Sequence, residues 1–309
     1  MKKYKKLIIT AASEGYAESL LALLGSLNVN WPGHPPVLVY DIGLGKETRE
    51  KLEAHQIPVR QVPPFCPHWR KHYTWKLWCW NDAPAEHVLW MDAGIAVLAP
   101  LDEVFEAIER LGYFAVPTDY ELTEHAHLDA CRGCGIPPEF RKGRMALAAA
   151  LVGMDKSGPM GALVSEALRI AHEERCIAST EDIFNTDQGI YSLLMYKYFK
   201  SVVIADGEIY LGGLSPRQTA CQKVWHHRRR MVREDLDYYS RYIYTTGPRY
   251  QPQMPINGIM WFIKRPGHVL AKTREKGILE ACRIALRYIL GQLGWRRGDK
   301  VRVRMGLRD

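Results

Sequence analysis

The first part of the chain alternates short apolar runs with amphipathic segments. The apolar runs are too short for helices and predict strands over residues 6–10, 37–41 and 57–62. Apolar positions at spacings of three and four predict helices over residues 16–27 and 46–55. Strands and helices in this alternating order are typical of a parallel sheet with helices on both faces. We therefore predict an α/β fold built on a doubly wound, mostly parallel sheet.

The pattern continues along the chain without an internal repeat. A run of Val, Leu, Trp and Met predicts a strand that is buried on both faces and ends at Asp92. The further elements that we expect are a helix over 101–111, a strand over 113–117, a loop to about residue 143, a strand over 145–154, helices over 160–171 and 187–198, and a strand over 201–206. We predict one compact domain over residues 1–230 and a C-terminal extension over residues 231–309.

The composition is ordinary for a globular protein, with 47% hydrophobic and 25% charged residues. No apolar run reaches the roughly 18 residues that a membrane-spanning helix needs. The basic start of the chain is followed by an apolar run that is short for a signal peptide. The 7 cysteines are an odd number at scattered spacings, which favours reduced thiols. These features predict a cytoplasmic protein.

The net charge of +8 is concentrated in the C-terminal tail. Residues 264–309 contain 13 Lys and Arg residues against 4 Asp and Glu residues, so the rest of the chain is about neutral. A helix expected over residues 269–293 has one apolar face, which either docks on the domain or lies on an anionic membrane surface. The second alternative would make the protein peripheral at the inner face of the membrane. Because the charge is confined to this tail and no nucleic-acid motif occurs, we expect no nucleic-acid partner.

A lysine and an aspartate form the first candidate site. Lys76 lies in the aromatic-rich segment Tyr73–Trp80, and Asp92 closes the buried strand that follows. Ligands of open α/β sheets bind outside the carboxyl ends of the strands, where Asp92 is expected. The pair suggests a site for a phosphate-bearing ligand with a hydroxylated or metal-bound part. Alternatively, Asp92 is a turn residue and Lys76 a solvated helix residue with a buried stem.

Four motifs occur in an order that resembles the GT-A fold of nucleotide-sugar glycosyltransferases, especially the glycogenin-like (family eight-like) retaining superfamily. The motifs are Lys76-Leu-Trp-Cys-Trp80, Leu89-Trp-Met-Asp92-Ala-Gly94, Leu101-Asp-Glu-Val-Phe105 and Thr186-Asp-Gln-Gly189. The resemblance covers roughly residues 5–230. It implies a hexosyltransferase-like enzyme that moves a sugar from a nucleoside diphosphate, with UDP favoured, to a hydroxyl acceptor. Retention of configuration is also expected from the resemblance. The basic tail favours a glycan or lipid-linked acceptor at a membrane surface, as in polysaccharide biosynthesis.

The same resemblance implies roles for individual residues. Asp187 would hold hydroxyls of the transferred sugar, Gln188 would lie near its anomeric carbon, and Lys76 would neutralise phosphate. Tyr16 would stack on the nucleobase, although packing in the core is an alternative. The expected donor-binding residues are Thr10, Ala11, Tyr16, Lys76, Asp92, Ala93, Gly94 and Arg228.

One departure from the family pattern concerns the metal. The second aspartate of the Asp-x-Asp motif, usually the principal ligand, is replaced by Gly94. Mg²⁺ or Mn²⁺ needs a cage of oxygen ligands, which Asp92 alone does not supply. Either a divalent cation is held by Asp92 with His226 and His227, or the site is metal-free and cationic side chains hold the diphosphate. The motif leaves both alternatives open.

Two other functions are weighed against transfer. A sugar nucleotidyltransferase would need a glycine-rich phosphate loop after the first strand, and residues 11–15 are a poor candidate. A non-catalytic GT-A-like binding or scaffold protein would be compatible with Gly94. The segment Cys131-Arg-Gly-Cys134, with His125 and His127 nearby, could bind zinc, but a single Cys-x-x-Cys pair is weak evidence. We favour a flexible loop on the acceptor side.

Overall fold

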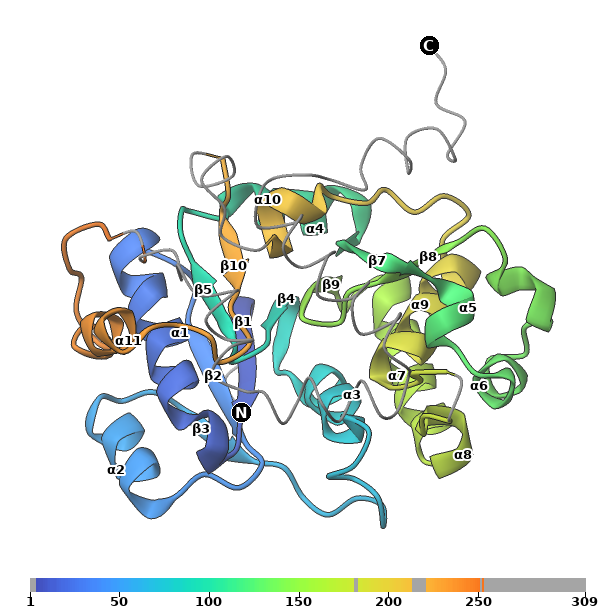
Figure 1. Cartoon of the computed structure of the whole chain (residues 1–309), viewed down its shortest axis with the longest axis horizontal. Helices are drawn as coiled ribbons and strands as arrows, with labels where there is room; N and C mark the ends of the chain where they lie inside the picture. Colours follow the sequence, from blue (N-terminus) through green and yellow to red (C-terminus); the bar gives the residue numbers. More distant parts are fainter. Residues whose placement is uncertain (1–3, 181–182, 213–220, 251, 253–309) are drawn as a thin grey trace, which may run out of the picture. The chain divides into compact units, whose positions relative to one another are not determined.

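The computed structural model of the chain describes residues 4–180, 183–212, 221–250 and 252. Its central sheet has six strands in the order β3-β2-β1-β4-β9-β6 (Figure 1). These strands are β1 (Tyr4–Ala12), β2 (Val37–Asp41), β3 (Val59–Gln61), β4 (Ala85–Met91), β6 (Tyr113–Phe114) and β9 (Leu151–Asp155). Strands β1 to β4 are parallel, and β9 is antiparallel to its neighbours β4 and β6. The predicted α/β fold with a mostly parallel sheet is confirmed.

Helices cover both faces of this sheet. The main ones are α1 (Ala17–Asn30), α2 (Lys46–Ala54), α3 (Thr74–Asp82), α4 (Asp102–Leu111), α7 (Pro159–Ala171) and α9 (Asp187–Tyr198). Because side chains alternate along a strand, Leu7 and Ile9 of β1 pack on the face covered by α3, α7 and α9. Ile8 packs on the opposite face, against α1 and α4. None of the helices in the described ranges is long and apolar enough to cross a membrane.

Shorter elements complete the described part of the chain. They are η1 (Glu14–Tyr16), β5 (Ile95–Val97), β7 (Pro117–Glu121), α5 (Leu122–His125), α6 (Leu128–Gly133), η2 (Pro138–Arg141), β8 (Met145–Leu147), α8 (Glu174–Ile177), α10 (Gly207–Leu211), β10 (Val224–His226) and α11 (Arg233–Ser240). Strand β10 pairs with β5, and β7 pairs with β8, in two separate antiparallel ladders.

Three predicted strands differ from the structure. The strand expected over residues 113–117 is reduced to β6, and residue 117 already belongs to β7 in another sheet. The strand expected over residues 145–154 is divided into β8 and β9, which belong to different sheets. The segment 201–206 forms no strand beside β6, because its backbone lacks a regular ladder. The amide of Ala205 donates to the Ala115 carbonyl, but the amide of Val203 donates to the Tyr113 hydroxyl instead of the backbone.

The loop predicted to extend to about residue 143 contains the short helices α5, α6 and η2. A reciprocal pair of hydrogen bonds between Glu121 and Glu124 caps α5, and the His127 ring accepts from an amide at the start of α6. Cys131 and Cys134 lie on and at the end of α6 and are buried in the core, and burial raises the pKa of both thiols. The described residues contain no group of three or more His, Cys, Asp or Glu that could hold a metal. Because both cysteines are buried on and at the end of a short helix, the Cys-x-x-Cys segment is part of the core and is not the loop that we favoured.

Helix α11 lies beyond the predicted domain boundary at residue 230 and packs against α1 (Figure 1). A Cβ atom at Gly25 of α1 would lie 1.8 Å from the Tyr239 carbonyl oxygen, so the close approach of the two helices requires a glycine here. The division into residues 1–230 and 231–309 stays a prediction. The basic tail and the helix expected over residues 269–293 lie outside the described residues.

Candidate active site

Three charged residues that are far apart in the sequence meet at the carboxyl end of β4. The Nζ atom of Lys76 lies 2.9 Å from Oδ1 of Asp92 and 3.2 Å from Oδ2 of Asp187. Lys76 is in the first turn of α3, Asp92 directly follows β4, and Asp187 is the first residue of α9. The structure thus places two predicted catalytic residues and the strand-end aspartate in one cluster, where α/β sheets commonly bind ligands.

The Lys76 ammonium is buried, with 4% of the residue exposed. A buried charge is stable only when it is paired and hydrogen-bonded, and here two carboxylates and the Ala149 carbonyl surround it. Burial alone would lower the pKa of Lys76, but Asp187 and Asp92 outweigh it and raise that pKa. Burial raises the pKa of Asp187, while the ammonium opposes the change. Lys76 is therefore charged at neutral pH.

Local structure directs these side chains toward each other. His72 and Tyr73 have left-handed φ angles of 54° and 59°, an unusual conformation for residues other than glycine, and they turn the chain into α3. The Lys76 Nζ atom lies 5.4 Å from the ring centre of Tyr73 and 5.5 Å from that of Trp90. The Trp90 indole donates to Oδ1 of Asp92 over 2.8 Å. The aromatic residues thus hold both members of the Lys76–Asp92 pair.

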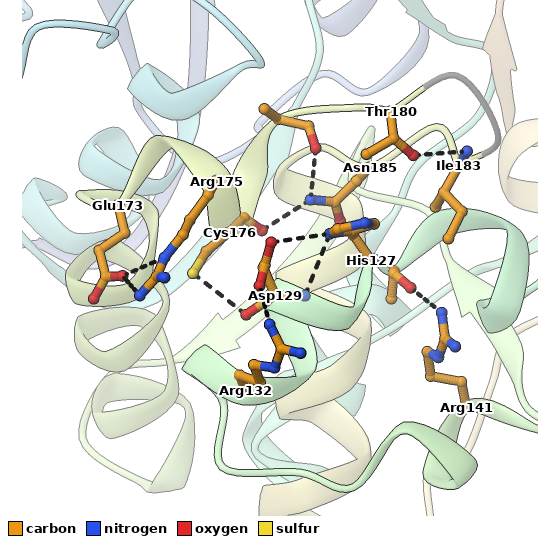
Figure 2. A network of polar contacts seen from close by, with 12 residues as sticks. His127, Asp129, Arg132, Arg141, Glu173, Arg175, Cys176, Thr180, Ile183 and Asn185 are labelled. Carbon is orange, nitrogen blue, oxygen red and sulfur yellow. Dashed lines mark hydrogen bonds and ion pairs between the residues drawn. The ribbon is translucent and has the colours of Figure 1, made fainter.

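Asn185 fixes the segment that leads into Asp187. Its side chain is fully buried, and its Nδ2 atom donates to the carbonyls of Cys176 (2.8 Å) and Ala178 (3.2 Å). Its Oδ1 atom accepts from the His127 amide over 3.4 Å, so Asn185 joins the α8 and α6 regions to α9 (Figure 2). Sequence reasoning missed this residue, because a lone asparagine before a helix is most simply interpreted as a cap.

Gly189 is a second residue that the sequence analysis did not interpret. A Cβ atom at this position would lie 2.2 Å from the His125 carbonyl oxygen and 2.4 Å from Oδ1 of Asn185. Only glycine therefore allows α5 to approach the first turn of α9 this closely. The signal was present in the sequence, since glycine inside a helix costs about 1 kcal/mol relative to alanine and needs a reason. Gln188, between Asp187 and Gly189, is half-buried.

The strand β10, which was not predicted, brings the two histidines and the arginines to this end of the sheet. His226 is paired with Ile95 of β5, three residues after Asp92. Burial lowers the pKa of His226 to about 4, although Asp92 opposes the change. His227 is almost fully buried, its ring centre lies 5.3 Å from that of Trp225, and burial lowers its pKa to about 3. Both imidazoles are neutral at pH 7.

The predicted metal ligands do not fit the oxygen cage that Mg²⁺ or Mn²⁺ requires. The carboxylates of Asp92 and Asp187 each have an oxygen paired with the Lys76 ammonium, and His227 is turned into the core beside Trp225. Gly94 supplies no ligand. Within the described ranges, Asp92, His226 and His227 do not form a three-ligand metal group.

The residues predicted to contact the nucleoside lie along and after β1. Thr10 and Ala11 have buried side chains, and the Thr10 hydroxyl has no hydrogen-bond partner within the described part of the chain. Tyr16 is 41% exposed, and its ring centre lies 5.2 Å from the guanidinium carbon of Arg229. A hollow of about 220 Å³ lies beside it. Its lining residues are Glu14, Gly15, Glu18, Ser19, Arg229, Met231 and Leu236.

Comparison with known proteins identifies the fold. No family model and no curated protein sequence matches this chain. The apo structure of the bifunctional glycosyltransferase WbbM is similar with a TM-score of 0.51 and 15% identity, over 86% of this chain and 52% of WbbM. This chain thus corresponds to about half the length of WbbM.

Two further solved structures are less similar. The galactosyltransferase LgtC, in complex with donor and acceptor sugar analogues, has a TM-score of 0.43 and 15% identity over 85% of this chain and 95% of LgtC. The glycosyltransferase GlyE of Streptococcus pneumoniae TIGR4 has a TM-score of 0.41 and 12% identity over 67% and 46% of the two chains. Of these three structures, WbbM alone is similar enough to identify the fold, and this likeness confirms the predicted GT-A type.

Proposed function

We propose that this protein is a glycosyltransferase that moves a sugar from a nucleoside diphosphate sugar to a hydroxyl group of a glycan acceptor. The observation that carries the proposal is the Lys76–Asp92–Asp187 cluster, because a buried, paired lysine and two carboxylates meet at the strand ends of a glycosyltransferase fold. Buried charges are costly, so a cluster of three at the ligand-binding edge of the sheet favours a functional role.

The nucleoside would lie near the end of β1. Tyr16 offers a partly exposed ring, and the adjoining hollow of about 220 Å³ is smaller than the roughly 300–1,000 Å³ of a typical small-molecule pocket. This volume suits part of a nucleotide, with the diphosphate extending toward Asp92 and Arg228. Uracil is the favoured base through the family resemblance. Thr10 is fully buried and Ala11 is 5% exposed, so neither residue offers an open surface to the base.

The chemistry would be mainly electrostatic. Transfer breaks the bond between the anomeric carbon and a phosphate oxygen and forms a bond from that carbon to the acceptor oxygen, while the acceptor hydroxyl loses its proton. Negative charge develops on the departing diphosphate, and fixed positive charges beside it lower the barrier. Lys76, whose ammonium faces Asp92, Asp187 and the Ala149 carbonyl, would hold the two carboxylates in place. Asp187 would accept hydrogen bonds from sugar hydroxyls, and Gln188 would lie near the anomeric carbon. Retention of configuration is proposed from the family resemblance alone.

The acceptor is proposed to be a glycan, and a lipid-linked one would agree with the basic C-terminal tail. Residues 264–309 carry a net charge of +9, from 13 Lys and Arg against 4 Asp and Glu, and would be attracted to an anionic membrane. Sedimentation of the protein with vesicles that contain anionic lipid tests this part of the proposal. Equal recovery with neutral vesicles would exclude it.

Donor hydrolysis tests the proposed activity without knowledge of the acceptor. We expect slow nucleotide release from one of a set of UDP-, GDP- and CMP-sugars. In Asp187→Asn the rate of this release should fall by at least about a hundredfold, which is the cost of losing one group that hydrogen-bonds the transition state. Asp237→Asn is the matched control, because Asp237 has a 53% exposed side chain on α11. Binding of a nucleotide without turnover of any sugar donor would favour a non-catalytic binding protein. Absence of any nucleotide binding by the folded protein would refute the proposal.

A further inference from the structure

A sharp turn over residues 226–230 begins at the last residue of β10 and lies against Gly94, in the segment between β4 and β5. Arg228 and Arg229 have left-handed φ angles of 49° and 65°, and two consecutive residues of this kind cost free energy unless the surrounding structure stabilises them. The pairing of β10 with β5 fixes the entry to this turn. The Arg228 amide donates to the Gly94 carbonyl over 3.2 Å, and the Arg230 amide donates to the His227 carbonyl over 2.9 Å.

The backbone of this turn packs against Gly94. A Cβ atom at position 94 would lie 3.4 Å from Cα and 3.5 Å from the nitrogen of Arg228, which is ordinary contact distance. A single methyl group therefore fits, but the carboxyl group of an aspartate would need further room beside the backbone of the turn. Gly94 occupies the usual position of a metal-binding aspartate. Because it has no carboxyl group, the backbone of the turn over residues 226–230 can pack against it.

The turn adds positive charge to a site whose carboxylates are already paired. Lys76 contacts both Asp92 and Asp187, and the side chains of Arg228 and Arg229 are exposed. Neither arginine forms an ion pair within 4.0 Å with a residue in the described ranges.

The two acidic residues that line the same hollow as Arg229 have other partners. Glu14 accepts hydrogen bonds from the Gly45 amide and the Thr48 hydroxyl, and Glu18 pairs with Arg233 over 2.6 Å. These two carboxylates therefore have other partners, and the exposed arginine side chains give the turn its positive charge.

We propose that the turn formed by residues 226–230 binds the diphosphate of the donor directly and takes the place of a divalent cation. This inference rests on the proposed function and specifies how that site holds its substrate. A guanidinium can donate two parallel hydrogen bonds to a phosphate, and two such groups on one rigid turn match a dianionic diphosphate. The donor set agrees with this, because Gly94 and the Lys76 pairs leave too few oxygen ligands for a cage.

Calorimetry of UDP and GDP binding to the full chain tests the inference. We expect the wild-type Kd in EDTA and the wild-type Kd in Mn²⁺ to agree within about threefold. Arg228→Gln and Arg229→Gln should each raise the Kd about tenfold, as expected for the loss of a charge-assisted hydrogen bond. Arg175→Gln is the control of equal charge change, because Arg175 is 70% exposed and pairs with Glu173 next to α8. It should leave the Kd unchanged.

A second pair of variants separates the two explanations of Gly94. Gly94→Ala should bind UDP or GDP as the wild type does, whereas Gly94→Asp should bind at least about tenfold more weakly in EDTA and gain nothing from Mn²⁺. Thermal melting confirms that each variant folds, and the two arginine variants keep the test valid if Gly94→Asp does not.

The outcomes distinguish the two proposals. Binding that is tightened more than tenfold by Mn²⁺, in the wild type or in Gly94→Asp, would overturn the inference and leave the glycosyltransferase proposal intact. Unchanged affinity in both arginine variants would likewise overturn the inference and leave the glycosyltransferase proposal intact. Failure of the folded wild type to bind any nucleoside diphosphate, with or without Mn²⁺, would contradict the proposed function itself.

Discussion

Replacing Lys76 with methionine removes the ammonium that Asp92 and Asp187 share. Methionine keeps most of the buried volume, so the change mainly leaves a carboxylate without its partner. Asp187 is 2% exposed and cannot be solvated, whereas the side chain of Asp92 is 27% exposed and can reach water. Breaking a buried ion pair by removing one partner typically costs about 3–5 kcal/mol. We expect a loss of stability in this range at pH 7.

The cost has an upper limit, because Asp187 can take up a proton. An aspartate in an unfolded chain has a pKa of about 3.9, and one pKa unit corresponds to about 1.36 kcal/mol, so protonation at pH 7 costs about 4 kcal/mol. At pH 5 the same protonation costs about 1.5 kcal/mol. Burial raises the pKa of Asp187 in the folded state, so the folded variant binds more protons than the unfolded chain. The stability lost in the variant should therefore shrink as the pH falls.

Urea denaturation at pH 7 and pH 5 measures both effects. The free energy of unfolding of Lys76→Met should fall by about 3–4 kcal/mol at pH 7 and by about half of that or less at pH 5. Adding Asp187→Asn should recover most of the loss, and Lys46→Met should change stability by less than about 0.5 kcal/mol, since Lys46 is 88% exposed. A loss below about 1 kcal/mol at pH 7, or an equal loss at both pH values, would refute the reasoning.

Three further predictions concern the surroundings of the cluster. Gly189→Ala should lower the free energy of unfolding by about 1–3 kcal/mol in urea titrations, because its Cβ would overlap the His125 carbonyl oxygen, while Gly15→Ala, which has open space, should be neutral. Asn185→Ala should lower the free energy of unfolding by about 1–3 kcal/mol, because two buried carbonyls lose their partner. It should also slow donor hydrolysis by displacing Asp187, and unchanged hydrolysis would argue against a positioning role. The folded-state pKa of His227 is below its unfolded value, so stability is lost as the pH falls from about 6.5 toward 3. His227→Leu should therefore lose less stability between pH 7 and pH 4, and an unchanged acid profile would contradict this assignment.

The parallel half of the sheet could be predicted because its information is local. Strand β2, which ends at Asp41, and strand β4, which Asp92 follows, are short, apolar and separated by helical segments. Both their type and their polar ends therefore follow from sequence periodicity. The positions of Lys76 and Asp92 relative to each other follow from the same pattern. The pairing of Lys76 with Asp187 could only be expected from the family motifs, because it joins segments 111 residues apart, from 76 to 187.

The elements that sequence reasoning missed depend on distant partners. Strand β10 has three residues within a basic segment, and only its pairing with β5 makes it a strand. The predicted strand over residues 145–154 contains a run of alanines at 148–150, which carries no turn signal, although the chain changes sheets there. Likewise, the importance of Gly189 is visible only when α5 is placed against α9.

The burial of Lys76 limits how this chain can be shortened and how it can fold during synthesis. A fragment that ends at residue 180 contains Lys76 and the partly exposed Asp92 but lacks the more deeply buried acid of α9. During synthesis, α3 would pack fully only after Asp187 had emerged from the ribosome, because burying the Lys76 ammonium earlier would be unfavourable. The candidate active site and the packed core would then be completed together, and truncation products that stop short of this point would be exposed to proteolysis.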